Sequence, residues 1–369
     1  MNQLFRWDQM GLFLLALAAG ILPFAVPEVC AAALREGLTL CSGPLLLSLF
    51  PFLVVSRLLI QCPESDLLAL PFRLAAWVIG IRTPCAARVL CIGFLGGFAP
   101  AASAAAQAVR TGQLTAEEAD ALLPACICSG PSFVVLTVGQ SLLGSAELGV
   151  LLFAAQITAN YLTAALLNRF AGVRSVKPGS AAPASPAPPR LDEILADAAI
   201  TYCKLCGFIL FFRMLAAGAG ALLPAGAGTL CAVLLEVCSG CDLASRTGRW
   251  GSLLCCAALS VQGLSVLLQV RTICPPEMTL RPLYRSRLLH LPLSLALFYL
   301  LLPGGEADVF STLPARVLLM RRVPPDCALL VFAVCCMAAC TLRSGIRQVE
   351  QKQMARNAGG CCINSKTLL

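Results

Sequence analysis

The segment CICSGPSFVV, Cys126–Val135, places Gly130 and Pro131 in the middle of an apolar stretch. Glycine and proline in a helix interior release backbone N–H and C=O groups from the helical hydrogen bonds. In lipid those groups must find partners within the protein, so a broken helix persists only where it is buried or lines a wet cavity. The segment therefore predicts an interrupted helix inside a membrane protein.

Three further segments carry interruptions of the same kind. They are GFLGGFAPAASAAAQ (Gly93–Gln107), LLEVCSGCDLAS (Leu234–Ser245) and LSVQGLSVLLQV (Leu259–Val270). Two breaks thus fall in each half of the chain, in corresponding order. Paired breaks in two halves are typical of secondary transporters whose substrate site lies between discontinuous helices.

The polar and helix-breaking residues of these four segments form the predicted substrate site. Serine and glutamine side chains offer hydrogen bonds without the cost of a buried charge. The expected site residues are Gly97, Pro100, Ser129, Gly130, Pro131, Ser132, Glu236, Ser239, Gly240, Gln262, Gly263, Ser265 and Gln269.

The composition indicates a polytopic helical membrane protein. Of the 369 residues, 58% are hydrophobic and only 12% are charged, against about a quarter charged in a soluble domain. Apolar stretches suited to ~30 Å of hydrocarbon recur along the chain, and we expect an all-α fold with about eight to ten membrane segments, some of them broken or re-entrant. The stretches are Gly11–Val26, Leu38–Ile60, Arg88–Val109, Ala121–Leu143, Leu148–Leu167, Tyr202–Leu223, Gly228–Leu235, Leu253–Val270, Leu288–Leu302 and Cys327–Leu342. The first has neither a basic leading cluster nor a clear cleavage site, so we expect a retained span rather than a signal peptide.

The net charge of +8 follows membrane topology and does not indicate nucleic-acid binding. The basic residues gather in loops and at the end of the chain, as in Arg321 and Arg322 and in the tail from Arg343 to Lys366. Lys and Arg in loops are retained on the cytoplasmic side. We therefore expect a multi-pass protein of the cell membrane with a cytoplasmic linker and C-terminus.

A linker divides the chain into two halves. The segment GVRSVKPGSAAPASPAPPRLDE, Gly172–Glu193, is rich in Pro, Ala and Ser and cannot form a core. The predicted organisation is an N-terminal span (1–36), a first repeat (37–171), the linker (172–193), a second repeat (194–303), a loop and final span (304–345) and a basic cytoplasmic tail (346–369).

Three sequence echoes indicate that the halves are repeats. Phe50–Leu59 resembles Cys206–Leu215, Ser129–Val138 resembles Val261–Val270, and Leu148–Leu167 resembles Leu283–Leu302. Any two Leu- and Val-rich helices look somewhat alike, but the order of the three pairs is preserved, which favours duplication. Internal repeats of inverted topology are a known plan for transporters.

Three charged residues in or near apolar stretches allow more than one interpretation. A carboxylate at mid-membrane costs on the order of 3 kcal/mol, so Glu236 is a coupling residue, an acceptor for substrate, or simply a helix-end residue. Arg57 and Arg213 occupy matching places in the first echo and could pair with an anionic substrate. Snorkelling from a helix end toward the headgroups explains both arginines more simply.

The cysteines and the one histidine do not indicate a catalytic or metal site. Free cysteine packs as a small apolar residue, and with His290 alone neither a zinc site nor a hydrolase is favoured; we expect no enzyme and no cofactor, and His290 to be a packed helix residue. The tetrapeptide CSGP begins at Cys41 and at Cys128, and CSGC begins at Cys238. We interpret the first copy as a coincidence of composition and the other two as helix breaks.

The soluble segment Ala108–Leu123 precedes the second break of the first half. Thr115 and Glu118 have the spacing of a capping box, in which each side chain bonds the other residue's backbone N–H. The pair predicts a helix that starts near Ala116 and re-enters the membrane.

Together these segments resemble the sporulation integral membrane protein YlbJ family. The resemblance runs from about Gly37 to Leu302 and is most specific in the Gly-Gln-Leu-Thr turn, the Leu-Leu-Glu segment and the Gly-Leu-Ser-Val-x-Leu-Gln-Val segment. It implies two nucleoside-recognition Gate domains, related to those of concentrative nucleoside transporters and ferrous-iron permeases. It also implies transport of dipicolinate, a small anionic aromatic solute, toward the developing forespore, from the mother-cell or outer forespore membrane.

The chain departs from that family at both breaks of the first half. The family has Gly-Tyr-Pro where this chain has Gly97-Phe98-Ala99-Pro100, and Asn- and Ser-rich sequence where this chain has Cys126 to Gly130. The loss of hydrogen-bonding side chains also fits a divergent transporter of another small anion. A nucleoside or nucleobase symporter and a non-transporting sporulation scaffold are the alternatives. The sequence leaves open a coupling ion, H+ or Na+, and a homo-oligomer.

Overall fold

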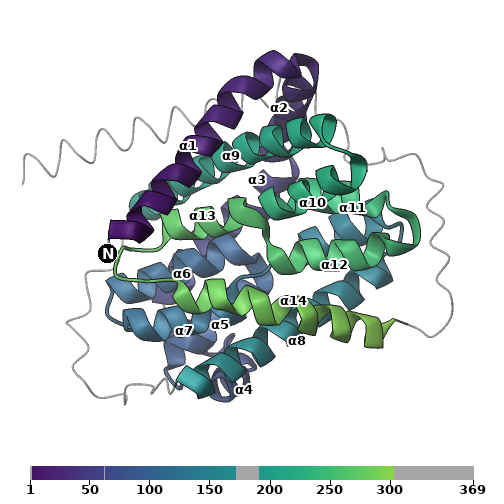
Figure 1. Ribbon diagram of the computed structural model, residues 1–369. Coiled ribbons are helices and arrows are strands. Elements are labelled where there is room, and N and C mark those ends of the chain that lie inside the picture. Colours follow the sequence, from purple (N-terminus) through teal and green to yellow (C-terminus); the bar gives the residue numbers. More distant parts are fainter. Residues whose placement is uncertain (1, 62, 172–190, 303–369) are drawn as a thin grey trace, which may run out of the picture.

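The computed structural model describes residues 2–61, 63–171 and 191–302, and every regular element within these ranges is a helix (Figure 1). Three helices come first: α1 (Asn2–Ala25), α2 (Pro27–Ser42) and α3 (Pro44–Gln61). The short η1 (Pro63–Asp66) and α4 (Phe72–Ile79) lead into the first pair of interrupted helices. The predicted all-α class is thus confirmed for the described residues.

The first half contains two helices that are each broken in the middle. Gly97 separates α5 (Pro84–Gly96) from α6 (Phe98–Arg110), and the segment 127–131 separates α7 (Ala116–Cys126) from η2 (Ser132–Leu142). The second part, η2, is a π-helix, a form that is rare and concentrates at functional sites. The long helix α8 (Ala146–Ala171) follows and packs along η2.

The second half repeats this order. After the long helix α9 (Leu191–Leu222), Glu236 separates α10 (Ala225–Leu235) from α11 (Val237–Ser245). The turn η3 (Gly248–Trp250) leads to α12 (Gly251–Val261), which Gln262 separates from α13 (Gly263–Ile273), and α14 (Arg281–Leu301) follows. The three sequence echoes fall on corresponding elements. They pair α3 with α9, the second break of the first half with the second break of the second half, and α8 with α14. That the halves are Gate-type repeats of inverted topology stays a prediction, as do the domain boundaries.

Within the described residues, fewer helices pass as membrane spans by length and composition than the eight to ten segments expected for the whole chain. Among the described residues, three helices are long and apolar enough to cross a membrane: Ala146–Ala171, Leu191–Leu222 and Gly248–Ile273. Two pairs bent by 111°, Phe13–Ala25 with Pro27–Ser42 and Phe72–Ile79 with Pro84–Gly96, raise the number to five if each pair is one span. The expected eight to ten included broken segments such as Arg88–Val109, which covers most of α5 and α6, and Ala121–Leu143, which covers part of α7 and all of η2. Each of these helices has only 11 to 13 residues and is too short to span alone, since a helix rises about 1.5 Å per residue. The predicted span Cys327–Leu342, the linker up to residue 190 and the basic tail lie outside the described residues.

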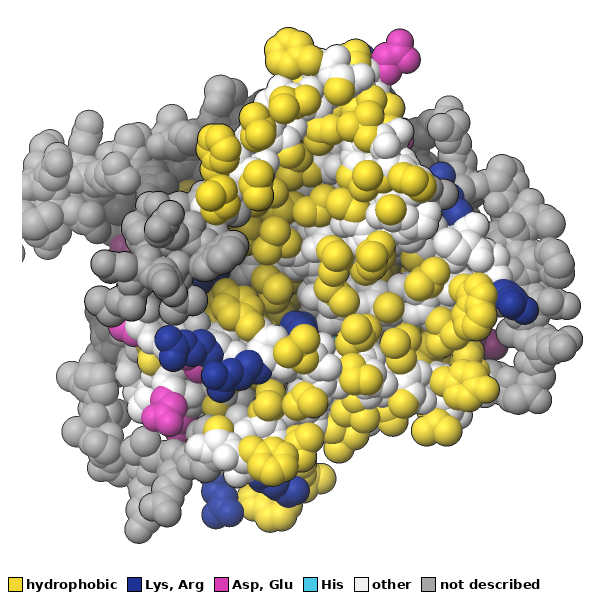
Figure 2. All heavy atoms as spheres, in the orientation of Figure 1, with side chains coloured by type: hydrophobic (Ala, Val, Ile, Leu, Met, Phe, Trp, Pro, Cys, Tyr) yellow, Lys and Arg dark blue, Asp and Glu magenta, His cyan; other side chains and the backbone are white. Residues whose placement is uncertain are grey.

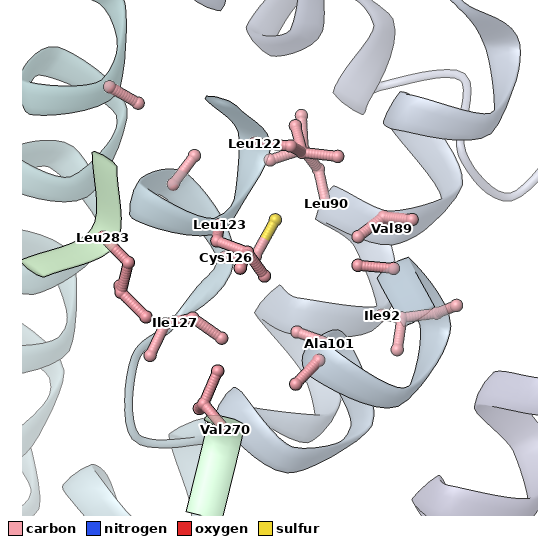
Figure 3. Packing of buried hydrophobic residues seen from close by; sticks show 14 of the residues in the cluster. Val89, Leu90, Ile92, Ala101, Leu122, Leu123, Cys126, Ile127, Val270 and Leu283 are labelled. Atoms are coloured by element: carbon pink, nitrogen blue, oxygen red, sulfur yellow. The ribbon is translucent and has the colours of Figure 1, made fainter. Parts of the chain in front are cut away.

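The largest core cluster is shared by the two halves. Cys126 and Ile127 at the end of α7 lie near Ala101 of α6, and Val270 of α13 and Leu283 of α14 reach the same cluster (Figure 3). The alanine-rich α6 is almost entirely buried, because small side chains let α3, α5 and α7 approach its backbone closely. The two halves therefore form one packed body in the described part of the molecule.

The surface is apolar over a wide area. Figure 2 shows hydrophobic side chains across the centre of one face, with most charged side chains toward its margins. Large side chains such as Phe24, Phe170 and Leu288 are about four-fifths or more exposed, at 89%, 82% and 79%. Exposed apolar surface on this scale is unfavourable in water and favourable in lipid, so the molecule fits a multi-pass membrane protein in a bilayer.

Two local predictions have clear outcomes. The capping box is confirmed: the Thr115 hydroxyl accepts from the Glu118 backbone N–H at 3.1 Å, and the Glu118 carboxylate accepts from the Thr115 N–H at 3.1 Å. The first CSGP is not a coincidence of composition. Cys41 and Ser42 end α2, Gly43 is its C-cap and Pro44 begins α3, so this copy also separates two helices.

Candidate functional site

A pocket lies between the broken helices of the two halves. Its cavity volume of about 60 Å³ is room for several water-sized positions. Both halves supply its walls, and α3 and α9 supply the remaining apolar side chains. The lining residues are Leu45, Leu49, Gly96, Phe98, Ser129, Gly130, Ser132, Phe133, Ile209, Glu236, Val237, Cys238, Val266 and Gln269. A mostly apolar wall with a few polar groups is typical of small-molecule sites.

In the first half the two breaks rest directly on each other. Gly97 has φ +80°, in the left-handed region that favours glycine. A Cβ atom there would lie 2.7 Å from the backbone nitrogen of Gly130 and 3.2 Å from the carbonyl oxygen of Cys128. Only glycine at position 97 lets the two interruptions approach this closely.

In the second half the two breaks also meet, but the first break is at Glu236, whereas the first break of the first half is at Gly97. Gly263 has φ +69°, and a Cβ there would lie 3.0 Å from the backbone nitrogen of Glu236. Glu236 itself is extended, with φ −151° and ψ 126°, and only 2% exposed. Its carboxylate accepts hydrogen bonds from the backbone N–H groups of Cys238 at 2.8 Å and Ser239 at 2.7 Å, and from the Ser239 hydroxyl at 2.9 Å. Glu236 is therefore the N-cap of α11, which stabilises the negative charge by hydrogen bonds and by the positive helix end.

A hydrogen bond joins the second breaks of the two halves. Gln262 donates from Nε2 to the Ser129 hydroxyl at 3.4 Å and to the Leu259 carbonyl at 2.5 Å. About two turns further along α13, Gln269 donates from Nε2 to the Ser265 hydroxyl at 2.9 Å. The Oε1 atoms of both glutamines are buried and without a hydrogen-bond partner among the described residues. Gln269 lines the pocket, and its amide oxygen is a buried acceptor without a described partner.

The predicted site residues divide into pocket-lining residues and supporting ones. Five line the pocket: Ser129, Gly130, Ser132, Glu236 and Gln269. Gly97 and Gly263 allow the close approach of the breaks, Gln262 and Ser265 hold polar lining residues, and Ser239 bonds Glu236. Pro131 is the N-cap of η2, and Pro100 lies in the first turn of α6. Gly240 was predicted to lie at a break, and this prediction is wrong. The residue lies inside α11, where a Cβ would be 2.8 Å from the Val233 Cα.

The apolar side of the pocket was not predicted from the sequence. Phe98 and Phe133 each follow a break by one to three residues and line the cavity, as do Leu45 and Leu49 of α3 and Ile209 of α9. An aromatic residue just after each break of the first half is a signal that the sequence did offer. The α3 and α9 residues carry no such signal, because they look like any lipid-facing leucine or isoleucine.

Arg57 and Arg213 were expected either to pair with a substrate anion or to snorkel toward the headgroups. In the structure each of them instead forms an ion pair with a carboxylate of a neighbouring helix. Arg57 of α3 donates from Nη1 to Asp197 of α9 at 2.6 Å, and Arg213 of α9 donates from Nη2 to Glu36 of α2 at 2.8 Å. Neither arginine lines the pocket. Their guanidinium groups connect α2, α3 and α9 and are not open to a substrate anion.

The remaining expected residues also have defined surroundings. His290 is fully buried in α14 and its Nε2 lies 3.2 Å from the Gln156 carbonyl, which fits a packed helix residue. The described cysteines are free thiols, and within the described ranges no group of three or more His, Cys, Asp or Glu side chains could hold a metal ion.

The helix ends at the breaks can stabilise negative charge. The N-termini of α6, η2 and α13 carry no side-chain cap, whereas Glu236 caps α11. Free N–H groups and the positive end of the helix dipole favour anions. At η2 the N–H groups of Phe133 and Val134 already donate to the Gly130 carbonyl at 3.1 and 3.0 Å, so this end contributes mainly its dipole. Phe98 and Ser132, the first residues of α6 and η2, line the pocket, so two of these ends adjoin it.

No family model, curated protein or solved structure matches the chain. The pocket geometry and the sequence pattern are therefore what bears on its function.

Proposed function

We propose that this protein is a multi-pass membrane transporter that passes a small anionic aromatic solute, dipicolinate, through the pocket between its broken helices. One observation carries the proposal: the breaks of both halves come together around a single cavity that is lined from both halves. Short helices that end in the interior are unfavourable in a membrane unless their free backbone groups line a cavity. A site of this kind allows one half to move against the other around a bound solute.

Three features support an anionic solute. The uncapped N-termini of α6 and η2 adjoin the cavity, and Ser129 and Ser132 add hydroxyl donors. The one carboxylate in the wall, Glu236, already accepts three hydrogen bonds from α11, which reduces its repulsion of a second negative charge. Phe98 and Phe133 line the cavity, and aromatic side chains pack well against a planar ring. Dipicolinate is chosen among small anions because of the resemblance to the YlbJ family.

The proposed setting follows from the same resemblance and from the loop charges. We place the protein in the mother-cell or outer forespore membrane, with the linker and C-terminus in the cytoplasm, moving dipicolinate toward the forespore. A coupling ion, H+ or Na+, and a homo-oligomer are compatible with this arrangement.

Uptake by lipid vesicles that contain the purified protein tests the proposal. We expect saturable uptake of labelled dipicolinate above that of protein-free vesicles. Ser132→Ala, at the pocket end of η2, removes a hydroxyl from the wall and should lower uptake severalfold. Ser141→Ala is the matched control, because Ser141 is near the far end of η2 and bonds only the Leu136 carbonyl among described residues. Dipicolinate uptake no higher than in empty vesicles would refute the proposal.

A nucleoside or nucleobase is the second candidate, and the amide oxygen of Gln269 favours it. Gln269 lines the pocket and its buried Oε1 has no described partner; an acceptor of this kind is satisfied by a ligand N–H, which dipicolinate at neutral pH lacks. Measuring nucleoside uptake in the same vesicles separates the two candidates. Gln269→Leu should abolish nucleoside uptake and affect dipicolinate uptake much less.

A further inference from the structure

Arg287 of α14 is a buried guanidinium that bonds carbonyl oxygens instead of a carboxylate. It is only 8% exposed. Its Nη2 donates to the carbonyl of Pro124 at 3.4 Å, and its Nη1 donates to the carbonyls of Ile127 at 3.4 Å and Ser260 at 3.5 Å. Pro124 and Ile127 lie at the carboxyl-terminal end of α7, and Ser260 lies at that of α12. One side chain thus reaches the last turns of both helices that lead into the second breaks.

The two helix ends can supply the charge that balances Arg287. None of the ion pairs between described residues includes this arginine. The carboxyl-terminal end of a helix carries about half a negative elementary charge, so the ends of α7 and α12 together offset about one positive charge. They do so only while both helices end beside the guanidinium. The stability of the buried charge therefore depends on both second breaks being in place.

The contacts of Arg287 lie two residues from the polar groups of the site. Ile127 precedes Ser129 by two positions, and Ser260 precedes Gln262 by two positions, while Gln262 and Ser129 share the hydrogen bond between the breaks. Behind Arg287, Asn160 of α8 accepts from Nη2 at 3.4 Å and fixes the guanidinium against a long helix. A movement of Arg287 would displace the backbone on which Ser129 is placed.

We propose that Arg287 is a positioning residue for the pocket: its guanidinium clasps the carboxyl-terminal ends of α7 and α12 and so fixes the second breaks of the two halves relative to each other. The planar fork of arginine suits this role, since its several N–H groups reach carbonyls in different directions. Lysine carries the same charge but cannot reach both helix ends with the same geometry. The inference deepens the proposed function, because the clasp sets the wall of the transport pocket.

Hydrogen exchange of the full-length protein in detergent tests the clasp without any substrate. We expect Arg287→Gln to accelerate exchange on the order of tenfold in the peptides that contain residues 127–131 and 260–263, both together, with α2 and α9 unchanged. Arg287→Lys, which keeps the charge, should accelerate exchange in at least one of the two peptides. Arg285→Gln is the matched control, because Arg285 is exposed on the same helix two residues away. Wild-type exchange in both peptides of the Arg287→Lys protein would overturn the proposal, even if the glutamine variant fails to fold.

Dipicolinate uptake by vesicles gives the second readout. Displacement of Ser129 should raise the concentration for half-maximal uptake in Arg287→Lys severalfold, with a smaller change in the maximal rate. A variant that loses maximal rate alone, in proportion to the amount of inserted protein, would contradict a positioning role. If the wild-type protein transports no dipicolinate, the proposed function fails, while the exchange experiment still decides the clasp.

Discussion

At the scale of single residues, Gly97 holds the first half of the site together through its missing side chain. Replacing it by alanine forces a Cβ to 2.7 Å from the Gly130 nitrogen and adds strain at φ +80°, about 1–2 kcal/mol for a left-handed non-glycine residue. We expect Gly97→Ala to separate the breaks and to lower vesicle uptake by about tenfold or more. Uptake per inserted protein is the measurement.

Gly80 provides the control for strain alone. It has φ +95°, but nothing described lies within 4 Å of a Cβ built there, and it ends α4 away from the pocket. Gly80→Ala should cost about 1 kcal/mol in thermal stability and leave uptake nearly unchanged. Equal losses of uptake in the two variants would mean that strain, and not the approach of Gly97 to Gly130, explains the effect.

The residues also show which part of the site is readable from sequence. Gly97, Gly130 and Gly263 stood out because glycine in an apolar helix has few other uses. Arg287 did not, because Arg281, Arg285 and Arg287 look alike in the sequence, and the first two are exposed. Only the helical phase that aligns Arg287 with the buried His290 and Ser294 separates it from a headgroup contact.

At the scale of elements, Glu236 determines where α11 begins. Its carboxylate accepts three hydrogen bonds from the first turn, and Glu236→Ala would leave the N–H groups of Cys238 and Ser239 without their acceptor. We expect a loss of about 1–3 kcal/mol in the free energy of unfolding, measured by denaturation in detergent. Asp242→Ala on the same helix removes only an exposed pair with Arg246 and should cost less than about 0.5 kcal/mol. Similar losses in both variants would contradict the capping role.

The elements were predicted less well than their breaks. Hydropathy measures how apolar a stretch is, and α5 to α7, α10, α12 and α13 are all apolar, so they were counted as spans or parts of spans. The break at Glu236 was placed near Gly240, because glycine is the usual sign of an interruption. An extended residue such as Glu236 needs no glycine. Its capping of the helix depends on a three-dimensional contact that hydropathy does not contain.

At the scale of the whole molecule, the two halves share a core and several polar contacts. Asp120 of α7 accepts hydrogen bonds from the Thr279 backbone N–H at 2.8 Å, the Thr279 hydroxyl at 2.7 Å and the Leu280 N–H at 3.2 Å, in the loop before α14. The pairs of sequence echoes located the halves, but their mutual packing was not predictable. It depends on contacts between residues more than a hundred positions apart.

The shared core predicts that the protein stays whole when its chain is cut between the halves. With a protease site inserted in the Pro/Ala/Ser-rich linker and cleaved in detergent, we expect the two pieces to elute together, because separation would expose the cluster in which Val270 and Leu283 reach Cys126 and Ile127 (Figure 3). Asp120→Ala should weaken the association by removing buried, charge-assisted hydrogen bonds, whereas Glu117→Ala, at an exposed position of the same helix, should not. Pieces that separate in mild detergent and remain folded would show that the halves are independent units. The shared core would then not be what holds the two walls of the pocket together.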